Sequence, residues 1–266
     1  LEESAQFHLP GGYDRVIAAL ARGLAPGSVR LGTTVTAVRW GRGAVEVEAK
    51  PVSAAEVERL RASCVVVTVP LGVLQALPGE AGSISFDPPL PEATRNAIER
   101  LGMGAVLKLV LRVRDPVWTW RREDGERVPW DLKFLHTTER IPTWWTPLPV
   151  RAPLIVGWAG TSSALSLPTD PPSLVADAAA SLSRAPGVTR AFVEDQIVAC
   201  HVHDWTLDPL CRGAYSYIPA GAMDAPAALA EPVDGVLFFA GEATTGAGQN
   251  GTVHGAIASG KRAAEA

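Results

Sequence analysis

The chain has 266 residues, of which 47% are hydrophobic and 20% are charged, and its formal net charge is −4. These values are typical of a globular protein that is long enough to bury a large core. The acidic balance argues against nucleic-acid binding, which usually needs a basic surface. No apolar run reaches the roughly 18–20 residues of a membrane-spanning helix. We therefore expect a soluble, cytoplasmic protein that binds neither nucleic acid nor membrane.

The cysteines and histidines do not form a recognisable metal or redox motif. Cys64, Cys200 and Cys211 are widely spaced and odd in number, so neither a disulfide framework nor a CxxC pair is predicted. Cys64 opens an apolar run, and we expect it to be a buried, inert thiol. His254 has no second histidine or carboxylate at ligand spacing, so we expect no metal site.

Periodicity predicts a helix and then strands in the first quarter of the chain. Apolar residues recur at helical spacing over residues 11–24. Apolar and polar residues alternate over 35–40 and 44–49 on either side of a Gly-Arg-Gly sequence, which predicts a β-hairpin. We also predict a short strand at 29–31 and a loop or short helix at 54–61.

The middle of the chain mixes helix and strand patterns. The β-branched run from Cys64 to Val69 indicates a strand covered on both faces, as in a sheet of parallel character. The remaining periodic segments predict helices at 92–101 and 172–184, helix or loop at 189–195, strands at 105–113, 154–159 and 197–203, and short strands and loops over 115–150.

The C-terminal section reads as a strand, a glycine-rich loop and a helix. Residues 235–242 form an apolar strand pattern, and a helix is predicted from Thr252 to Ala264. The loop contains a GxGxxG spacing at 246–251, but residues 242–245 separate it from the strand and the chain ends 15 residues after Gly251. It is therefore not interpreted as a primary dinucleotide fingerprint. The order of elements still places an anion or a ring system at a helix N-terminus.

Several segments, taken in order over residues 7–266, resemble one known family. Residues 240–242 together with 251–256 match its closing motif, and 212–217 (RGAYSY) match its RGSYSY segment. Residues 67–74 match its strand under the flavin. Residues 86–91 and 101–104 match its PPLP and LGxG segments. On these motifs the chain resembles the flavin-containing amine oxidases, a family that includes polyamine oxidases and lysine-specific histone demethylases.

The resemblance implies a mixed α/β (α+β) fold of the amine oxidase type with two portions. A partial FAD-binding, Rossmann-like domain is expected to be discontinuous, from residues 1–88 and 220–266, and a mixed-sheet substrate-binding domain is expected at 89–219. The family's N-terminal GxGxxG unit has no counterpart before residue 11. We therefore expect a fragment that is inactive alone and needs the missing N-terminal FAD-binding half, with an exposed sheet edge that favours a homo-oligomer.

The resemblance also implies how FAD is held. Binding is expected to be non-covalent, because Ala214 stands where covalently flavinylated relatives carry a cysteine. Glu242 matches the carboxylate at the ribose or ribityl hydroxyls, and Thr252 and Val253 match the helix start at the pyrimidine edge of the flavin. Val35 matches the residue whose backbone meets the adenine. The other cofactor-binding positions implied are Thr68, Pro70, Gly241 and Gly251.

Two residues are the implied catalytic groups. Lys108 matches the family lysine that reaches flavin N5 through a water molecule, and Tyr215 matches the aromatic ring that walls the amine against the flavin. Thr252 stands where monoamine oxidases have a second tyrosine, so the aromatic cage is incomplete and small monoamines are disfavoured as substrates. Trp205 matches a tryptophan of the family's substrate-side strand.

The implied reaction is oxidation of a small-molecule amine to an imine by FAD with O2 as acceptor, giving an aldehyde or ketone, ammonia or an amine, and H2O2. Two alternatives stay open. One is an L-amino-acid oxidase or a desaturase-like flavoprotein on the same scaffold; an arginine placed to bind a substrate carboxylate would favour the amino-acid oxidase, and Arg112, Arg140 and Arg151 are the candidates. The other is a non-catalytic interaction domain that has lost FAD.

Overall fold

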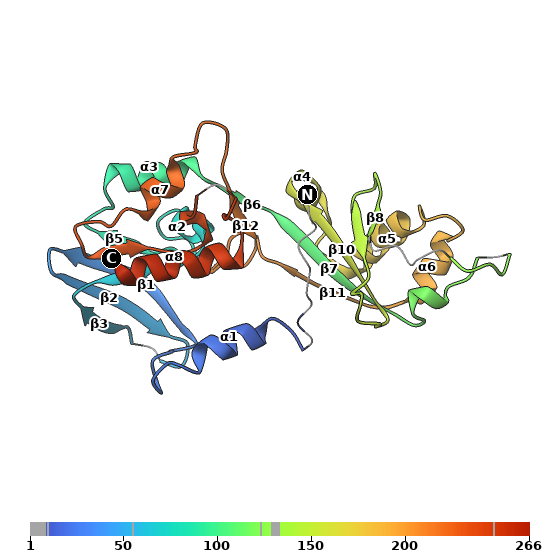
Figure 1. Cartoon of the computed structure of the whole chain (residues 1–266), viewed down its shortest axis with the longest axis horizontal. Coiled ribbons are helices and arrows are strands. Elements are labelled where there is room, and N and C mark those ends of the chain that lie inside the picture. The colour runs from blue at the N-terminus through green and yellow to red at the C-terminus, as the bar shows by residue number, and fades with distance from the viewer. Residues whose placement is uncertain (1–8, 10, 55, 123, 129–133, 247) are drawn as a thin grey trace. The chain divides into compact units, whose positions relative to one another are not determined.

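The computed structural model describes residues 9, 11–54, 56–122, 124–128, 134–246 and 248–266. The chain divides into two compact units, which are described separately. The first unit comprises Leu1–Leu31, Leu109–Trp158 and Asp170–His201, and the second comprises Gly32–Lys108, Ala159–Thr169 and Val202–Ala266. Helices and strands are mixed along the chain (Figure 1), so the expected α/β fold class is confirmed.

The compact units do not follow the residue limits expected for the cofactor and substrate portions. Residues 89–108 and 202–219 belong to the second unit, together with most of the expected flavin-binding portion, whereas residues 1–31 belong to the first. Assignment of a flavin-binding and a substrate-binding role to each portion stays a prediction.

A four-stranded sheet in the second unit contains the predicted hairpin. Strands β1 (Thr33–Gly41) and β2 (Ala44–Pro51) pair antiparallel, and β5 (Ser85–Asp87) pairs parallel with β1. The loop or short helix expected at 54–61 is wrong, because β3 (Glu58–Ala62) continues the sheet beyond β2. Cross-strand ion pairs explain how so polar a segment forms a strand. The Nε atoms of Arg59 and Arg61 lie 3.1 and 3.0 Å from carboxylate oxygens of Glu48 and Glu46.

A second, buried strand pair lies in the same unit. Strands β4 (Val65–Val67) and β13 (Leu237–Phe239) are parallel, as the β-branched pattern predicts, and all three residues of β13 are buried. The expectation that Cys64 is buried is wrong. The strand begins only at Val65, and the thiol is exposed just before it.

The described part of the second unit also contains five helices. They are α2 (Leu71–Leu74), α3 (Glu92–Arg100), α4 (Thr161–Ser166), α7 (Ala225–Ala230) and α8 (Val253–Glu265), with the 3₁₀ turn η2 at Glu242–Thr244. Helices α3 and α7 lie side by side (Figure 1). Arg100 Nη1 donates to Asp224 Oδ2 at 2.8 Å, and this hydrogen bond lowers the pKa of Asp224 at the start of α7. The apolar core of the unit includes Leu71, Ile98, Leu229, Leu237 and Phe239.

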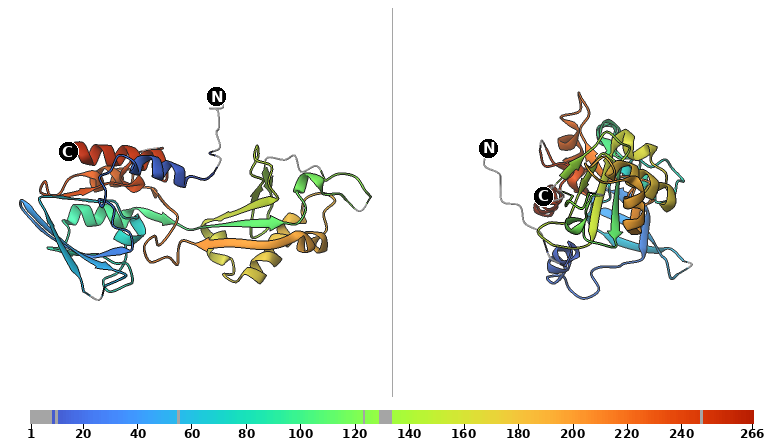
Figure 2. Two further views of the ribbon diagram at one scale, coloured as in Figure 1. Left: turned by 90° about the horizontal axis from the view of Figure 1, so that it is seen from below. Right: turned by 90° about the vertical axis from the view of Figure 1, so that its right-hand side faces the viewer.

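The first unit is built on a five-stranded sheet of order β11-β7-β10-β9-β8. Its strands are β7 (Val106–Val113), β8 (Phe134–His136), β9 (Thr143–Trp145), β10 (Leu154–Gly160) and β11 (Ile197–Asp204). Strands β7 and β11 run side by side in Figure 2. The 3₁₀ turn η1 (Val117–Thr119) and helices α5 (Pro171–Leu182) and α6 (Arg190–Gln196) complete this region. The strands and helices predicted between residues 105 and 203 are therefore confirmed. The part of the predicted 115–150 region at 123 and 129–133 lies outside the described residues.

One buried hydroxyl organises the core of the first unit. Ser181 of α5 is fully buried, and its Oγ donates to the Ile141 carbonyl at 2.6 Å. The same Oγ lies 2.8 Å from Trp144 Nε1 and 2.9 Å from Thr137 Oγ1. A serine hydroxyl has one donor and two acceptor sites, so all three are used. These hydrogen bonds join α5 to Trp144 of β9 and to the residues just before that strand.

The N-terminal helix is shorter than predicted. Helix α1 spans Asp14–Ala21 and buries none of its residues. The short strand expected at 29–31 is wrong, since these residues form no strand, and Val29 and Leu31 are exposed. Among the described residues, no helix combines the length and the apolar character that crossing a lipid bilayer requires.

Candidate functional site

The end of β13 and the helix α8 are joined into a rigid support. Gly241 follows the strand with φ 130°, and its N–H donates to Ser259 Oγ of α8 at 2.8 Å. Arg262, also on α8, donates to the carbonyls of Thr244 and Phe239. Burial lowers the pKa of Arg262. These bonds fix the direction of α8 relative to the strand that precedes it in the second unit.

At the N-terminus of α8, one backbone amide is capped by a side chain, and two others have no partner within the helix. Thr252 caps the helix, because its Oγ1 accepts from the Gly255 N–H at 3.1 Å while donating to the Gln249 carbonyl at 2.5 Å. A Cβ on Gly255 would lie 2.1 Å from the Gln249 oxygen, so only glycine fits there. The amides of Val253 and His254, the first two residues of the helix, have no acceptor inside it and point out of its positive end.

Glu242 connects two distant segments. Its Oε1 accepts from the Ser216 N–H at 3.0 Å, and its Oε2 accepts from Ser216 Oγ at 2.6 Å and from the Gly251 N–H at 2.6 Å. A carboxylate offers about four acceptor sites, so three are occupied by the protein and one remains. Sequence reasoning predicted Glu242 as a ligand for hydroxyl groups but missed these protein partners, since no local pattern links residues 26 positions apart.

Strand β12 (Tyr215–Tyr217) presents two tyrosines on one face. Tyr215 and Tyr217 are 41% and 49% exposed, whereas Ser216 between them is 2% exposed. β12 pairs with β6 (Gly102–Gly104), and a Cβ on Gly102 would lie 2.2 Å from the ring of Tyr217, so that ring lies flat over the glycine. Sequence reasoning did not single out Tyr217.

The glycine loop lies against the first of these tyrosines. Gly251 has φ 70°, and a Cβ placed on it would lie 3.4 Å from Tyr215 Cδ2. The structure therefore brings together four of the predicted positions, Tyr215, Glu242, Gly251 and Thr252, which with Ser216 form the Glu242 cluster. Ala247 of the same loop lies outside the described residues.

Three further predicted positions lie at the carboxyl ends of the parallel strands β4 and β13. Thr68 follows β4, and its carbonyl oxygen is 4.0 Å from a Cβ placed on Gly241. Pro70 precedes α2 as its N-cap residue. Ligands bind α/β sheets at the carboxyl ends of parallel strands, and this edge leads directly into the Glu242 loop.

The remaining predicted positions lie on other elements. Val35 is partly buried in β1, beside a register shift between Val35 and Ala37. Lys108 is on the exposed face of β7. Trp205 is half-exposed, with its carbonyl accepting from the Gly213 N–H at 3.0 Å and its ring against His203. The roles predicted for these three residues stay predictions.

The arginines considered for a substrate carboxylate have other partners or an exposed position. Arg140 Nη1 lies 2.7 Å from Asp177 Oδ2, and the guanidinium of Arg151 lies 5.6 Å from the centre of the Trp118 ring. Arg112 is exposed on β7. Arg140 already pairs with a carboxylate of the protein and is therefore the least suited of the three to bind a substrate carboxylate.

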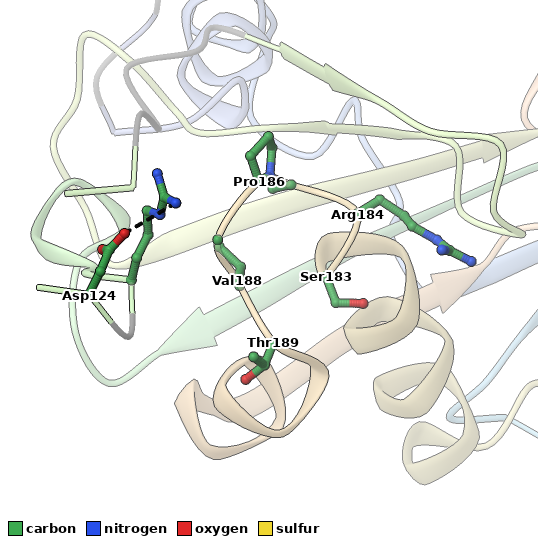
Figure 3. Close-up of a pocket in the computed structure, with 9 residues that line it drawn as sticks. Asp124, Ser183, Arg184, Pro186, Val188 and Thr189 are labelled. Carbon is green, nitrogen blue, oxygen red and sulfur yellow. Dashed lines mark ion pairs between the residues drawn. The ribbon is translucent and has the colours of Figure 1, made fainter. Parts of the chain in front are cut away.

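A hollow of about 660 Å³ in the first unit is a weaker candidate for a binding site. It is lined by the loop Ser183–Thr189 and by Arg122 and Asp124 (Figure 3). Arg122 pairs with Asp124 at 3.2 Å, and Arg184 points away from Asp124 and pairs with Glu139 at 2.6 Å. Both cations are thus paired with carboxylates of the protein, which does not suit an anion site.

A hollow of about 990 Å³ in the second unit lies between β1, β5, α3 and the segment 74–84, and it contains none of the predicted site residues. Within the described ranges, no group of three or more His, Cys, Asp or Glu side chains is placed to hold a metal ion. Of the features considered, only the Glu242 cluster combines donors, an acceptor and an exposed aromatic ring.

Comparisons with known proteins identify relatives of the whole chain. The chain is 35% identical over 296 aligned residues to polyamine oxidase 1 of Oryza sativa subsp. japonica, an alignment that covers 96% of the chain and 55% of the rice protein. It is 32% identical to lysine-specific histone demethylase 1 homolog 2 of Arabidopsis thaliana, over 96% of the chain and 32% of that protein. The chain thus spans about half, or less, of the length of these relatives.

Solved structures show the same fold. Putrescine oxidase, solved as wild type bound to putrescine, aligns with a TM-score of 0.74 at 23% identity over 96% of this chain and 52% of that one. Cyclohexylamine oxidase from Brevibacterium oxydans IH-35A aligns with a TM-score of 0.68 at 22% identity. The family model described as "flavin containing amine oxidoreductase" matches residues 2–266. The chain therefore belongs to the flavin-containing amine oxidoreductase family.

Proposed function

We propose that this chain supplies the flavin-contacting and amine-contacting residues of an FAD-dependent amine oxidase. The observation that carries the proposal is the cluster in which Glu242 joins the Gly251 loop to the strand of Tyr215. It places a capped helix N-terminus, a carboxylate with one acceptor site to spare and a half-exposed aromatic ring in one small region of the second unit.

The donors and acceptors of this region fit a flavin. The amides of Val253 and His254 at the positive end of α8 suit the electron-rich pyrimidine edge of the ring. The remaining acceptor site of Glu242 suits one hydroxyl of the ribityl or ribose chain. Glycine at position 251 keeps the loop free of a side chain beside Tyr215. Ala214 offers no thiol, which supports non-covalent binding.

When bound, FAD would supply the redox chemistry of this reaction, in which an amine is oxidised to an imine that water hydrolyses to a carbonyl compound and an amine or ammonia, with O2 as the final acceptor and H2O2 as its product. The residues of the chain orient the reactants. The exposed ring of Tyr215 holds the amine by shape and by cation–π attraction. Lys108 holds the water that takes part in turnover, as its match to the family lysine implies.

The incomplete aromatic cage favours a long substrate. Thr252, at the position of the second cage tyrosine of monoamine oxidases, leaves one side of Tyr215 without a facing ring. A chain of methylene groups between amines suits such an opening better than a small monoamine. We therefore place aliphatic diamines and polyamines first among the substrates.

The experiment uses a protein that contains this chain, supplied with FAD, mixed without oxygen with spermidine, putrescine and methylamine in turn. Bleaching of the visible flavin band by spermidine or putrescine, followed by H2O2 production when air is admitted, is the expected result. A protein that stays colourless after addition of FAD contradicts the proposal and supports a non-catalytic interaction domain.

Lys108→Met is expected to slow turnover by about 10²-fold, the scale of a positioned proton-transfer group, with little change in FAD content. Arg112→Met is a matched control, because Arg112 is the next exposed cation on the same face of β7. Steady-state H2O2 production measures both. Unchanged turnover in Lys108→Met removes that residue from the mechanism, and loss of activity in Arg112→Met favours an amino-acid substrate.

A further inference from the structure

We propose that Ser216 is a positioning residue that, through Glu242, fixes the ring of Tyr215 relative to the glycine loop and the N-terminus of α8. The proposal rests on the proposed function for its catalytic consequence. The connection of β12 to the glycine loop through Glu242 needs no flavin and can be tested without it.

The N–H, the hydroxyl and the carbonyl of Ser216 all form hydrogen bonds with residues of the segment 242–250. Its N–H donates to Glu242 Oε1 at 3.0 Å and its Oγ donates to Glu242 Oε2 at 2.6 Å. Its carbonyl accepts from Asn250 Nδ2 at 3.4 Å. The residue is 2% exposed. Ser216 is thus held at three points by Glu242 and Asn250.

Strand β12 needs this support. It has three residues and pairs with the three-residue strand β6 in a two-stranded sheet, and so small a sheet is only marginally stable alone. The carboxylate of Glu242 accepts the Ser216 N–H as a backbone carbonyl of a neighbouring strand does. Because Tyr215 directly precedes Ser216, a shift of Ser216 moves the Tyr215 backbone and its ring.

The same carboxylate fixes the loop. Glu242 Oε2 accepts from the Gly251 N–H at 2.6 Å, and Gly251 is followed by the cap residue Thr252. One carboxylate therefore sets the separation between the tyrosine and the helix end. Reacting groups must be held to about 0.5 Å for efficient chemistry, and hydrogen bonds to a charged acceptor are shorter and stronger than those between neutral groups.

The first test measures amide hydrogen exchange in the chain without flavin. In Glu242→Gln, the amide nitrogen of glutamine faces N–H and O–H donors, so exchange at Gly251 and Ser216 is expected to rise by about tenfold or more. In Ser216→Ala, exchange at Gly251 is expected to rise by about threefold to tenfold, although residue 216 does not bond to Gly251.

Ser181→Ala is the matched control, since it removes a buried hydroxyl of the first unit, and it is expected to leave exchange at Gly251 unchanged. The coupling is contradicted if Ser216→Ala leaves Gly251 unchanged, or if Ser181→Ala changes it equally.

The second test uses the flavin-loaded protein. Ser216→Ala is expected to lower the rate of flavin reduction by amine about tenfold while FAD affinity changes by less than about threefold, and Ser216→Thr, which keeps the hydroxyl, is expected to restore the rate. A parallel fall in flavin affinity and rate shows a merely structural role and overturns the proposal. If no flavin binds, the proposed function fails, but the exchange at Gly251 still decides the coupling.

Discussion

Two buried serines show how the two units differ. Ser181 in the first unit and Ser216 in the second are both almost fully buried and fully hydrogen-bonded. The partners of Ser181 belong to the first unit, and its hydroxyl has no acceptor site to spare. The partner of Ser216 is a carboxylate with one acceptor site left, beside two half-exposed tyrosines. A saturated network specifies packing, whereas an unsaturated one at an exposed edge marks a place where a ligand completes the bonding.

The largest expected effect tests whether the hydrogen bonds around Ser181 serve the stability of the first unit. Trp144 is buried, donates to Ser181 Oγ, and contacts Gly157 of the neighbouring strand. Trp144→Ala leaves a large cavity and is expected to lower the free energy of unfolding by about 3–5 kcal/mol. Denaturant unfolding measures the loss.

Flavin binding by the folded Trp144→Ala protein should be unchanged, since the expected flavin contacts lie in the second unit. If FAD affinity falls in proportion to stability, the two networks are not distinct in role and the comparison is wrong.

A smaller effect is expected in the glycine loop. Gly251 has φ 70°, and a Cβ there lies 3.4 Å from Tyr215. Gly251→Ala is therefore expected to cost about 1–2 kcal/mol of stability and to weaken flavin binding. Gly246→Ala is the matched control, because Gly246 lies in the same loop with open space around its Cβ position. Calorimetry and flavin titration compare the two variants, and equal behaviour contradicts the account of the loop.

The smallest effect concerns pH and the helix that carries Ser181. Asp170 caps α5 by accepting from the Ser173 N–H at 2.9 Å, and this hydrogen bond lowers the pKa of Asp170. A lowered pKa in the folded state stabilises the fold above the ordinary carboxyl pKa, and this contribution is lost as pH falls through the lowered value. Asp170→Asn keeps a good cap but does not titrate, so its stability should vary less between neutral and acidic pH. Thermal unfolding across that range checks this, and identical pH profiles contradict it.

Periodicity predicted the elements whose pattern is local. The hairpin of β1 and β2, the helices α3, α5 and α8, and the parallel character of β4 all follow from residues within one segment. The errors arose where pairing decides. Residues 58–62 form a strand because they pair with β2, which their own sequence does not reveal, and residues 29–31 form no strand although their apolar pattern suggested one.

The family motifs predicted which residues belong to the candidate site, but they did not predict how those residues contact one another. The motifs singled out Glu242, Thr252 and Tyr215, and the structure brings these positions together. Ser216 could not be predicted, because its bonds to Glu242 join segments far apart in sequence. The contact of Gly251 with Tyr215 likewise depends on the folded loop.

The most direct test of the central claim is hydrogen exchange, with and without FAD, of a protein that contains this chain. The account predicts that FAD slows exchange at residues 215–217 and 248–256 of the second unit and leaves residues 134–145 and 171–182 of the first unit unchanged. Absence of any slowing at the Glu242 cluster, or slowing centred on the Ser181 network, contradicts it.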